Sequence, residues 1–233
     1  MEICKNQTIT FSLKYCGDCL LYFLKKLEKN NNREWFQDNK TIFEDAKQSA
    51  DVDFQEVYKK LSNSDELSPL KIYRIYRDVR FSTDKTPYKN HFSMYVGRQQ
   101  PDNRGGYYLH IQPGESFIGV GFFGPNKEDL LRIRKEIELD DELQQILQSK
   151  EIKNTFGNLV GEEVKTAPKG FNKEHERIDL IKKKQFLLIH KLSDEDVLSK
   201  DFTDKVVTVF KASRPFVNYI TDVLLTNLNG EKI

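Results

Sequence analysis

Cysteine and long apolar segments are both scarce in this sequence. Its 233 residues include only three cysteines, an odd number that does not build a disulfide framework and is typical of a reducing compartment. No apolar run approaches the roughly 20 residues that a membrane helix needs. The first residues, 1–6, also lack the charged-then-apolar pattern of a signal peptide. We therefore expect a cytoplasmic protein with no membrane partner.

Net charge and metal-binding motifs are scarce too. The formal charge is +1, so nothing global favours a nucleic acid or a membrane, and any electrostatic argument must be local. None of the histidines lies in a spacing such as H-x-x-x-H, and no Ser–His–Asp or paired-carboxylate arrangement stands out. We predict no metal site. The sequence leaves the cofactor, the reaction and the oligomeric state open.

Apolar residues, in contrast, recur in clusters along the whole chain and make up 38% of it, which predicts a single folded domain over residues 1–233. The period is helical before residue 62 and after residue 126, and close to two between residues 71 and 123. Short connections cannot make parallel crossovers. We therefore predict an α+β fold, in which an antiparallel sheet of about four or five strands is flanked by N-terminal and C-terminal helices. The expected strands are 71–81, 92–96, 109–111, 117–123 and 186–190.

Helix ends are marked by their capping residues. Asn32 is suited to cap a helix that begins near Trp35, and Ser193 precedes the acidic start of another. The last helix, predicted over residues 202–228, contains Pro215, which we expect to kink it.

Basic and aromatic residues are concentrated in the segment from Lys71 to Arg98. Its seven cations face only Asp78 and Asp84 over the same span. Alternation puts Arg74, Tyr76, Asp78 and Arg80 on one side of the first strand. By the same parity, Ser93, Tyr95, Tyr108, His110, Gly119 and Gly121 point away from the apolar sides of their own strands. If the strands pair as a meander, these groups share one face, and the two glycines leave room on it.

Arginines in such a setting suit phosphate or carboxylate, because the guanidinium group donates paired hydrogen bonds. We therefore predict a site for a small anionic ligand, such as a phosphate ester or a nucleotide. The predicted ligand-binding residues are Arg74, Arg77, Arg80, Lys85, Tyr88, Lys89, Tyr108, His110 and Lys184. Asp78 and His110 are the candidates for a catalytic role if the protein is an enzyme, Asp78 either as a base or by orienting an arginine.

Other interpretations stay open. Arg–Asp and Lys–acid pairs could make the basic segment purely structural, and a sheet face with aromatics and arginines could bind single-stranded nucleic acid. Gly119-x-Gly121-x-x-Gly124 matches a dinucleotide-binding pattern, but no parallel strand is expected after it, so close packing is the simpler reading. Cys16-Gly-Asp-Cys19 fits a redox pair, part of a zinc site or unreactive thiols.

Four blocks of the sequence resemble one known family. They are Asn31-Asn-Arg-Glu-Trp-Phe36 with Asn39-Lys40, the block from Arg74 to Lys89 (RIYRDVRFSTDKTPYK), Tyr108-Leu-His-Ile111, and Pro168-Lys-Gly-Phe171 with residues 178–184. Together they are similar to the domain-of-unknown-function family numbered 2461, whose members are uncharacterised single-domain proteins of bacteria, fungi and plants. The resemblance covers nearly the whole chain. It implies an α+β fold and no established activity, and its most specific block falls on the basic segment.

Overall fold

The computed structural model describes residues 17–101, 103–227 and 231–232. They form a five-stranded antiparallel sheet in the order β1-β2-β3-β4-β5, with helices before and after it in the chain. The strands are β1 (Lys71–Ile72), β2 (Phe92–Gly97), β3 (Gly106–Ile111), β4 (Phe117–Phe122) and β5 (Phe186–Lys191). The predicted α+β class, with helices on both sides of the sheet in the chain, is therefore confirmed.

The helices follow the predicted periodicities. Those before the sheet are α1 (Gly17–Lys29), α2 (Arg33–Asp38) and α3 (Lys40–Ser62). Between β4 and β5 lie α4 (Lys127–Leu139), α5 (Glu142–Gln148), α6 (Lys150–Phe156) and α7 (Ile178–Ile181). After β5 come α8 (Asp194–Leu198), α9 (Phe202–Ala212) and α10 (Arg214–Leu225). The Asn32 and Ser193 side chains accept the expected cap hydrogen bonds. The last helix breaks at Ser213, two residues before Pro215.

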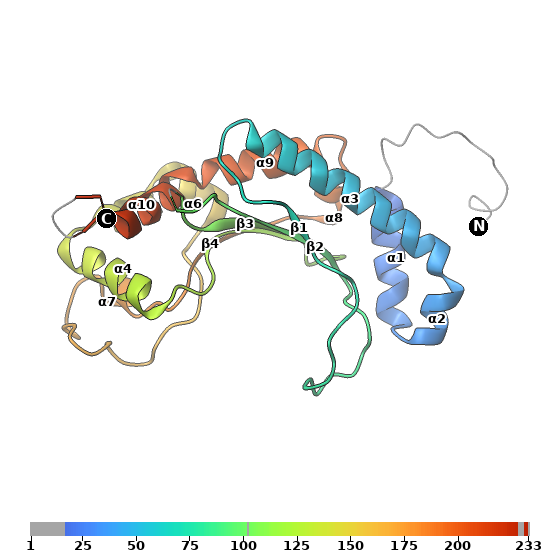
Figure 1. Ribbon diagram of the computed structural model, residues 1–233, viewed down its shortest axis with the longest axis horizontal. Coiled ribbons are helices and arrows are strands. Elements are labelled where there is room, and N and C mark those ends of the chain that lie inside the picture. Colours follow the sequence, from blue (N-terminus) through green and yellow to red (C-terminus); the bar gives the residue numbers. More distant parts are fainter. Residues whose placement is uncertain (1–16, 102, 228–230, 233) are drawn as a thin grey trace.

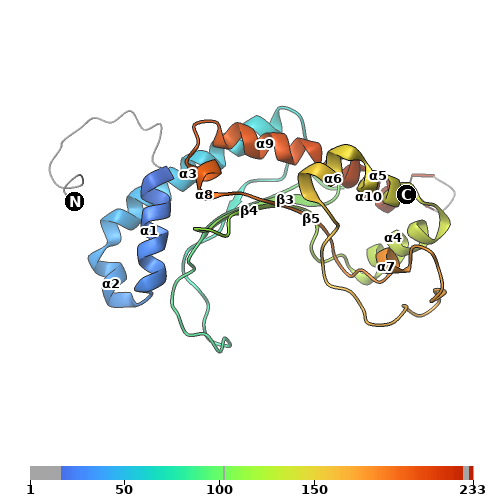
Figure 2. The same ribbon diagram turned by 180° about the vertical axis from the view of Figure 1, so that it is seen from behind.

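One face of the sheet carries the main core. Helices α3, α9 and α10 lie along it (Figure 1), and α3 presents to it a stripe of buried residues at spacings of three and four. The stripe is Phe43, Ala46, Ala50, Phe54, Val57 and Leu61. Burial of the alternate strand residues Met94, Leu109 and Ile118, none of them exposed to solvent, completes the core. None of the helices in the described part of the chain lies along the opposite face (Figure 2).

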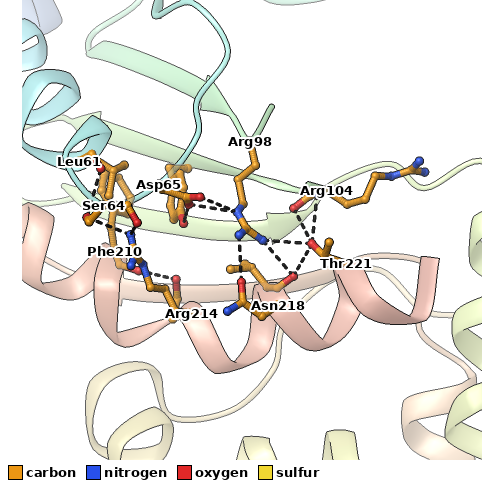
Figure 3. Close-up of polar contacts among 12 residues, drawn as sticks. Leu61, Ser64, Asp65, Arg98, Arg104, Phe210, Arg214, Asn218 and Thr221 are labelled. Atoms are coloured by element: carbon orange, nitrogen blue, oxygen red, sulfur yellow. Dashed lines mark hydrogen bonds and ion pairs between the residues drawn. The ribbon is translucent and has the colours of Figure 1, made fainter. Parts of the chain in front are cut away.

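A buried polar network around Arg98, directly after β2, joins the loop after α3 to α10 (Figure 3). The Arg98 Nε donates to the Asp65 carboxylate at 3.0 Å, and only 6% of each side chain is exposed. Arg98 also donates to the Thr221 hydroxyl at 3.0 Å and to the Asn218 side-chain oxygen at 2.9 Å. The Tyr107 hydroxyl donates to Asp65 at 2.6 Å. Every charge in this network has partners, which makes its burial tolerable.

The predicted strand over residues 71–81 is wrong after Ile72. The chain leaves the sheet there and forms a two-stranded arm, residues 73–91, which extends beyond the open face of the sheet (Figure 1). Ile72 pairs with Met94, whereas Tyr76 pairs with Tyr88. Six residues on the return side therefore span the same length as four on the outgoing side. Two extra residues bend a ladder out of its plane, and Pro87 has no N–H with which to extend it.

Two absences hold for the described part of the chain. None of its helices is both long and apolar enough to cross a bilayer. No group of three or more of its His, Cys, Asp or Glu side chains is placed to hold a metal ion. Cys4 and Cys16 lie outside the described residues, so the interpretations of the Cys16–Cys19 motif stay predictions. The cytoplasmic location also stays a prediction.

Candidate functional site

The open face of the sheet brings together part of the predicted site. Ser93 lies opposite His110, and Tyr108 lies between Tyr95 and Gly119 in the ladder. Directly opposed residues of an antiparallel pair point to the same side. The predicted sharing of one face by these groups is therefore confirmed by the register.

The two glycines of β4 differ in the space around them. A Cβ at Gly119 would make ordinary van der Waals contacts, with the Ile189 side chain at 3.4 Å and the Phe117 ring at 3.8 Å, so Gly119 leaves space for a methyl group. Gly121 has φ +127°, and a Cβ there would lie 2.2 Å from the Phe186 carbonyl oxygen and 3.0 Å from the Phe216 ring of α10. Gly121 thus serves close packing, which is the simpler reading of the glycine pattern.

Rings of two histidines and one phenylalanine contact one another in a row across this face. The ring centroids of His91 and His110 are 4.1 Å apart, and those of His110 and Phe117 are 4.7 Å apart. Tyr73, where the chain leaves β1, meets the edge of Tyr108 at 6.3 Å. Aromatic rings from the start of the arm, from its return segment and from strands β3 and β4 therefore line the site.

Hydrogen bonds fix the tautomer of the neutral His110 ring. The Tyr108 hydroxyl lies 3.1 Å from its Nδ1, and the Gln112 side-chain oxygen lies 3.0 Å from its Nε2. The Gln112 amide nitrogen in turn donates to Glu115, which leaves the amide oxygen to accept from Nε2–H. Nδ1 then accepts from the tyrosine hydroxyl. Burial also lowers the pKa of His110 below its ordinary value.

His91 has a different environment. None of the described groups of the chain forms a hydrogen bond with its ring, and its ring nitrogens are not fully buried. Burial of the ring, the neighbouring His110 and the Lys89 ammonium lower the pKa of His91 to about 3. The ring is therefore neutral at pH 7 and is free to contact a ligand.

Two lysines lie beside the Tyr73 ring, and Arg74 follows it in the chain. The Lys71 and Lys89 ammonium groups lie 5.0 and 5.2 Å from its centroid, within the range of cation–π attraction. Burial, and then the Arg74 guanidinium, lower the pKa of Lys89 below its ordinary value. Among the described residues, none of these three cations forms an ion pair with a carboxylate. This edge of the face is therefore electropositive.

The other predicted cations of the arm are occupied within it. Arg77 pairs with Asp84 and donates to Thr86. Arg80 donates to both oxygens of Asp78, at 2.9 and 2.7 Å. The Lys85 ammonium donates to the Val79 carbonyl at 2.9 Å. These groups make the arm a self-contained hairpin.

Asp78 is also a poor base in this setting, because its hydrogen bonds with Arg80 lower the pKa of the carboxyl group.

Two predicted residues lie elsewhere. Tyr88 points to α2, where its ring is parallel to that of Phe36. Lys184 pairs with Glu162 at 2.6 Å, just before the start of β5. The cluster around His110 is at the other end of that strand, because His110 pairs with Phe117 and Phe117 with Lys191. A six-residue strand is about 20 Å long, so Lys184 cannot share the ligand with Lys89.

Sequence reasoning missed Lys71, Tyr73 and His91 as site residues. The signal for His91 was available, because Lys89, His91 and Ser93 alternate with Asn90 and Phe92. A cavity of about 420 Å³ lies by α5, α6 and α7, and one of about 580 Å³ lies beside the end of α3. Neither is lined by any of the predicted residues.

Comparison with known families agrees with the resemblance of the four sequence blocks. The model of a family of conserved hypothetical proteins, DUF2461, matches residues 20–219. The chain belongs to this family. The matched region of DUF2461 includes the whole sheet, the arm and the cluster around His91, whereas Cys16 and Cys19 precede it. Neither the curated proteins nor the solved structures contain a significant match to the chain.

Proposed function

We propose that the protein binds a small anionic ligand, a phosphate ester or a nucleotide, on the open face of its sheet. Lys71, Arg74 and Lys89 hold the anion, and Tyr73, His91, Tyr108 and His110 line the site. This proposal keeps Arg74, Lys89, Tyr108 and His110 of the predicted set. It leaves out Arg77, Arg80 and Lys85, which have partners within the arm.

The half-buried Lys89 carries the proposal. A cation that is withdrawn from water costs free energy unless an anion compensates it. Lys89 has only the Tyr73 ring as a close partner among the described residues, and the charged group that lowers its pKa is Arg74, another cation. An anionic ligand would supply the missing charge. Its affinity would come from relieving this unfavourable arrangement as well as from direct contacts.

Thermal unfolding in the presence of inorganic phosphate and adenosine monophosphate tests the proposal, because a ligand that binds only the folded protein raises Tm. We expect a rise that depends on ligand concentration and that is lost in Lys89→Met, which keeps the apolar stem of the side chain. Arg80→Ala is the matched control, since Asp78 already neutralises that guanidinium. Equal shifts in both variants, or no shift in the unmodified protein, would refute the proposal.

Single-stranded nucleic acid is the second candidate ligand. The row of contacting rings from His91, His110 and Phe117 favours it, because bases stack on aromatic side chains of an open sheet. A strand contacts several cations through its phosphates, so its affinity falls steeply with salt. A fluorescent oligonucleotide titrated at increasing salt separates the two ligands. A steep slope and an affinity that increases with oligonucleotide length would favour the strand over the small anion.

A further inference from the structure

The two contacting histidines are chemically asymmetric. Both ring nitrogens of His110 are used within the protein, by Tyr108 and Gln112. The neighbouring ring of His91 has no such bonds among the described residues, and its nitrogens are not fully buried. A proton can therefore be added to His91 without breaking an internal hydrogen bond. Adding one to His110 would place an N–H against the tyrosine hydroxyl that donates to it.

The charges that face His91 explain why it is neutral without a ligand. Lys89 lies on the same segment of chain, and His110 faces it from β3. Both disfavour an added positive charge, and so does partial burial. The charge of Glu115, which follows β3, raises the pKa of His110. No carboxylate contributes to the electrostatics of His91 in the described structure.

An anion bound beside Lys89 reverses this balance. It offsets the repulsion from the ammonium group and can accept a hydrogen bond from an imidazolium. Building on the function proposed above, we propose that His91 is a further ligand-binding residue, which takes up a proton from solvent when the anion binds. The site therefore prefers doubly charged oxyanions, such as phosphate monoesters, to singly charged ones. Linkage is reciprocal, so the affinity for a dianion must then rise as the pH falls.

Sulfate is the best probe of this linkage, because its own charge does not change between pH 5 and pH 8. Methyl sulfate is the matched monoanion. Titration calorimetry at constant ionic strength should show that sulfate binds more tightly than methyl sulfate, by about tenfold at pH 5.5. The affinity for sulfate should increase several-fold from pH 7.5 to pH 5.5. Calorimetry in two buffers of different ionisation enthalpy should show that protons are taken up from the buffer.

His91→Gln is the decisive variant, since glutamine can hydrogen-bond an anion but does not titrate in this range. We expect it to bind sulfate with an affinity that no longer depends on pH and to lose the preference over methyl sulfate. His175→Gln, in the turn before α7, should behave like the unmodified protein. The imidazole NMR signals of His91 in the unmodified protein give an independent readout, and its pKa should rise when sulfate is added.

The outcomes separate the two proposals. Binding of sulfate that requires Lys89 but shows no pH dependence, no proton uptake and no shift of the His91 pKa would overturn this inference and leave the anion site intact. A pH dependence that persists in a folded His91→Gln protein would assign the proton to another group and would also overturn it. If neither oxyanion binds at any pH, both proposals fail.

Discussion

The rings of Phe36 and Tyr88 are stacked with their centroids 3.9 Å apart and their planes within 10° of parallel. Phe36 belongs to α2 and Tyr88 to the return segment of the arm, so the contact joins the N-terminal helices to a segment that has left the sheet. The Asn31 side chain reinforces it, donating to the Tyr88 carbonyl at 2.9 Å and accepting from its N–H at 3.1 Å. The position of the arm beside the site is therefore set from outside the sheet.

Asn31→Ala should loosen the arm. The substitution leaves the partly buried N–H and carbonyl groups of Tyr88 without their partners, which costs about 1–3 kcal/mol of unfolding free energy. Trypsin should cut after Arg80 faster in the variant, because the arm opens more often. Urea unfolding and timed proteolysis measure the two effects.

Asn30→Ala is the control for this prediction. The Asn30 side chain, directly after α1, donates to the Lys26 carbonyl of that helix at 2.9 Å. It forms no hydrogen bond with the described residues of the arm. Cleavage after Arg80 at the same rate in both variants would show that Asn31 does not hold the arm.

Arg98→Met should destabilise the fold strongly. The substitution leaves the Asp65 carboxylate buried without its cation and removes the bonds to α10, and breaking a buried pair in this way costs about 3–5 kcal/mol. Urea unfolding followed by circular dichroism checks it. Arg80→Met breaks a pair in which 77% of the arginine side chain is exposed, and we expect no resolvable loss of stability. Similar losses in the two variants would contradict the assigned role of burial.

Gly121→Ala tests the close approach of β4, β5 and α10. The left-handed backbone at this position costs about 1–3 kcal/mol for a residue with a Cβ, and the methyl group would also meet the Phe186 carbonyl oxygen. Thermal unfolding should show a large fall in Tm. Gly124→Ala is the matched substitution, because nothing lies within 4 Å of a Cβ there and its φ is outside the left-handed range. A Tm for Gly121→Ala as high as that of Gly124→Ala would rule out the packing role.

The sheet and its faces could be predicted because, in a strand that is buried on one side, the apolar residues of the alternating pattern must face the core. Met94, Leu109 and Ile118 alternate with residues of the open face, and the register puts them on the core side. The arm could not be predicted by the same rule. Its outgoing segment alternates just as well, since Ile75 is buried while Arg74 and Tyr76 are exposed, but its partner is its own return segment.

The site was predicted only in part, because the sequence shows which cations are near each other but not which carboxylates neutralise them. Asp78 and Asp84 are close in sequence to three arginines, and geometry assigns them to Arg80 and Arg77. Because these two carboxylates are taken by Arg77 and Arg80, Lys89 has no carboxylate partner among the described residues. His91 belongs to the return segment of the arm. Its ring contact with His110 depends on the path of that segment, which two extra residues bend.

The neutral state of His91 should make the fold sensitive to acid. Its pKa is about 3 in the folded protein and close to the ordinary value of about 6.5 in the unfolded chain. The unfolded chain therefore binds more protons between these two values, and stability rises with pH across this window. Stability from this group is complete above pH 6.5 and is lost as the pH falls toward 3, with a slope of at most about 1.4 kcal/mol per pH unit.

His91→Gln removes this contribution, because glutamine binds no proton in either state. Urea unfolding at pH 7.5, 6.5, 5.5 and 4.5 should give a shallower decline for the variant, with the two curves converging by about 1 kcal/mol or more at the lowest pH. Some slope should persist, since burial lowers the pKa of His110 as well. His175→Gln should keep the slope of the unmodified protein. Parallel curves for His91→Gln and the unmodified protein would show that His91 is not held neutral by the folded structure.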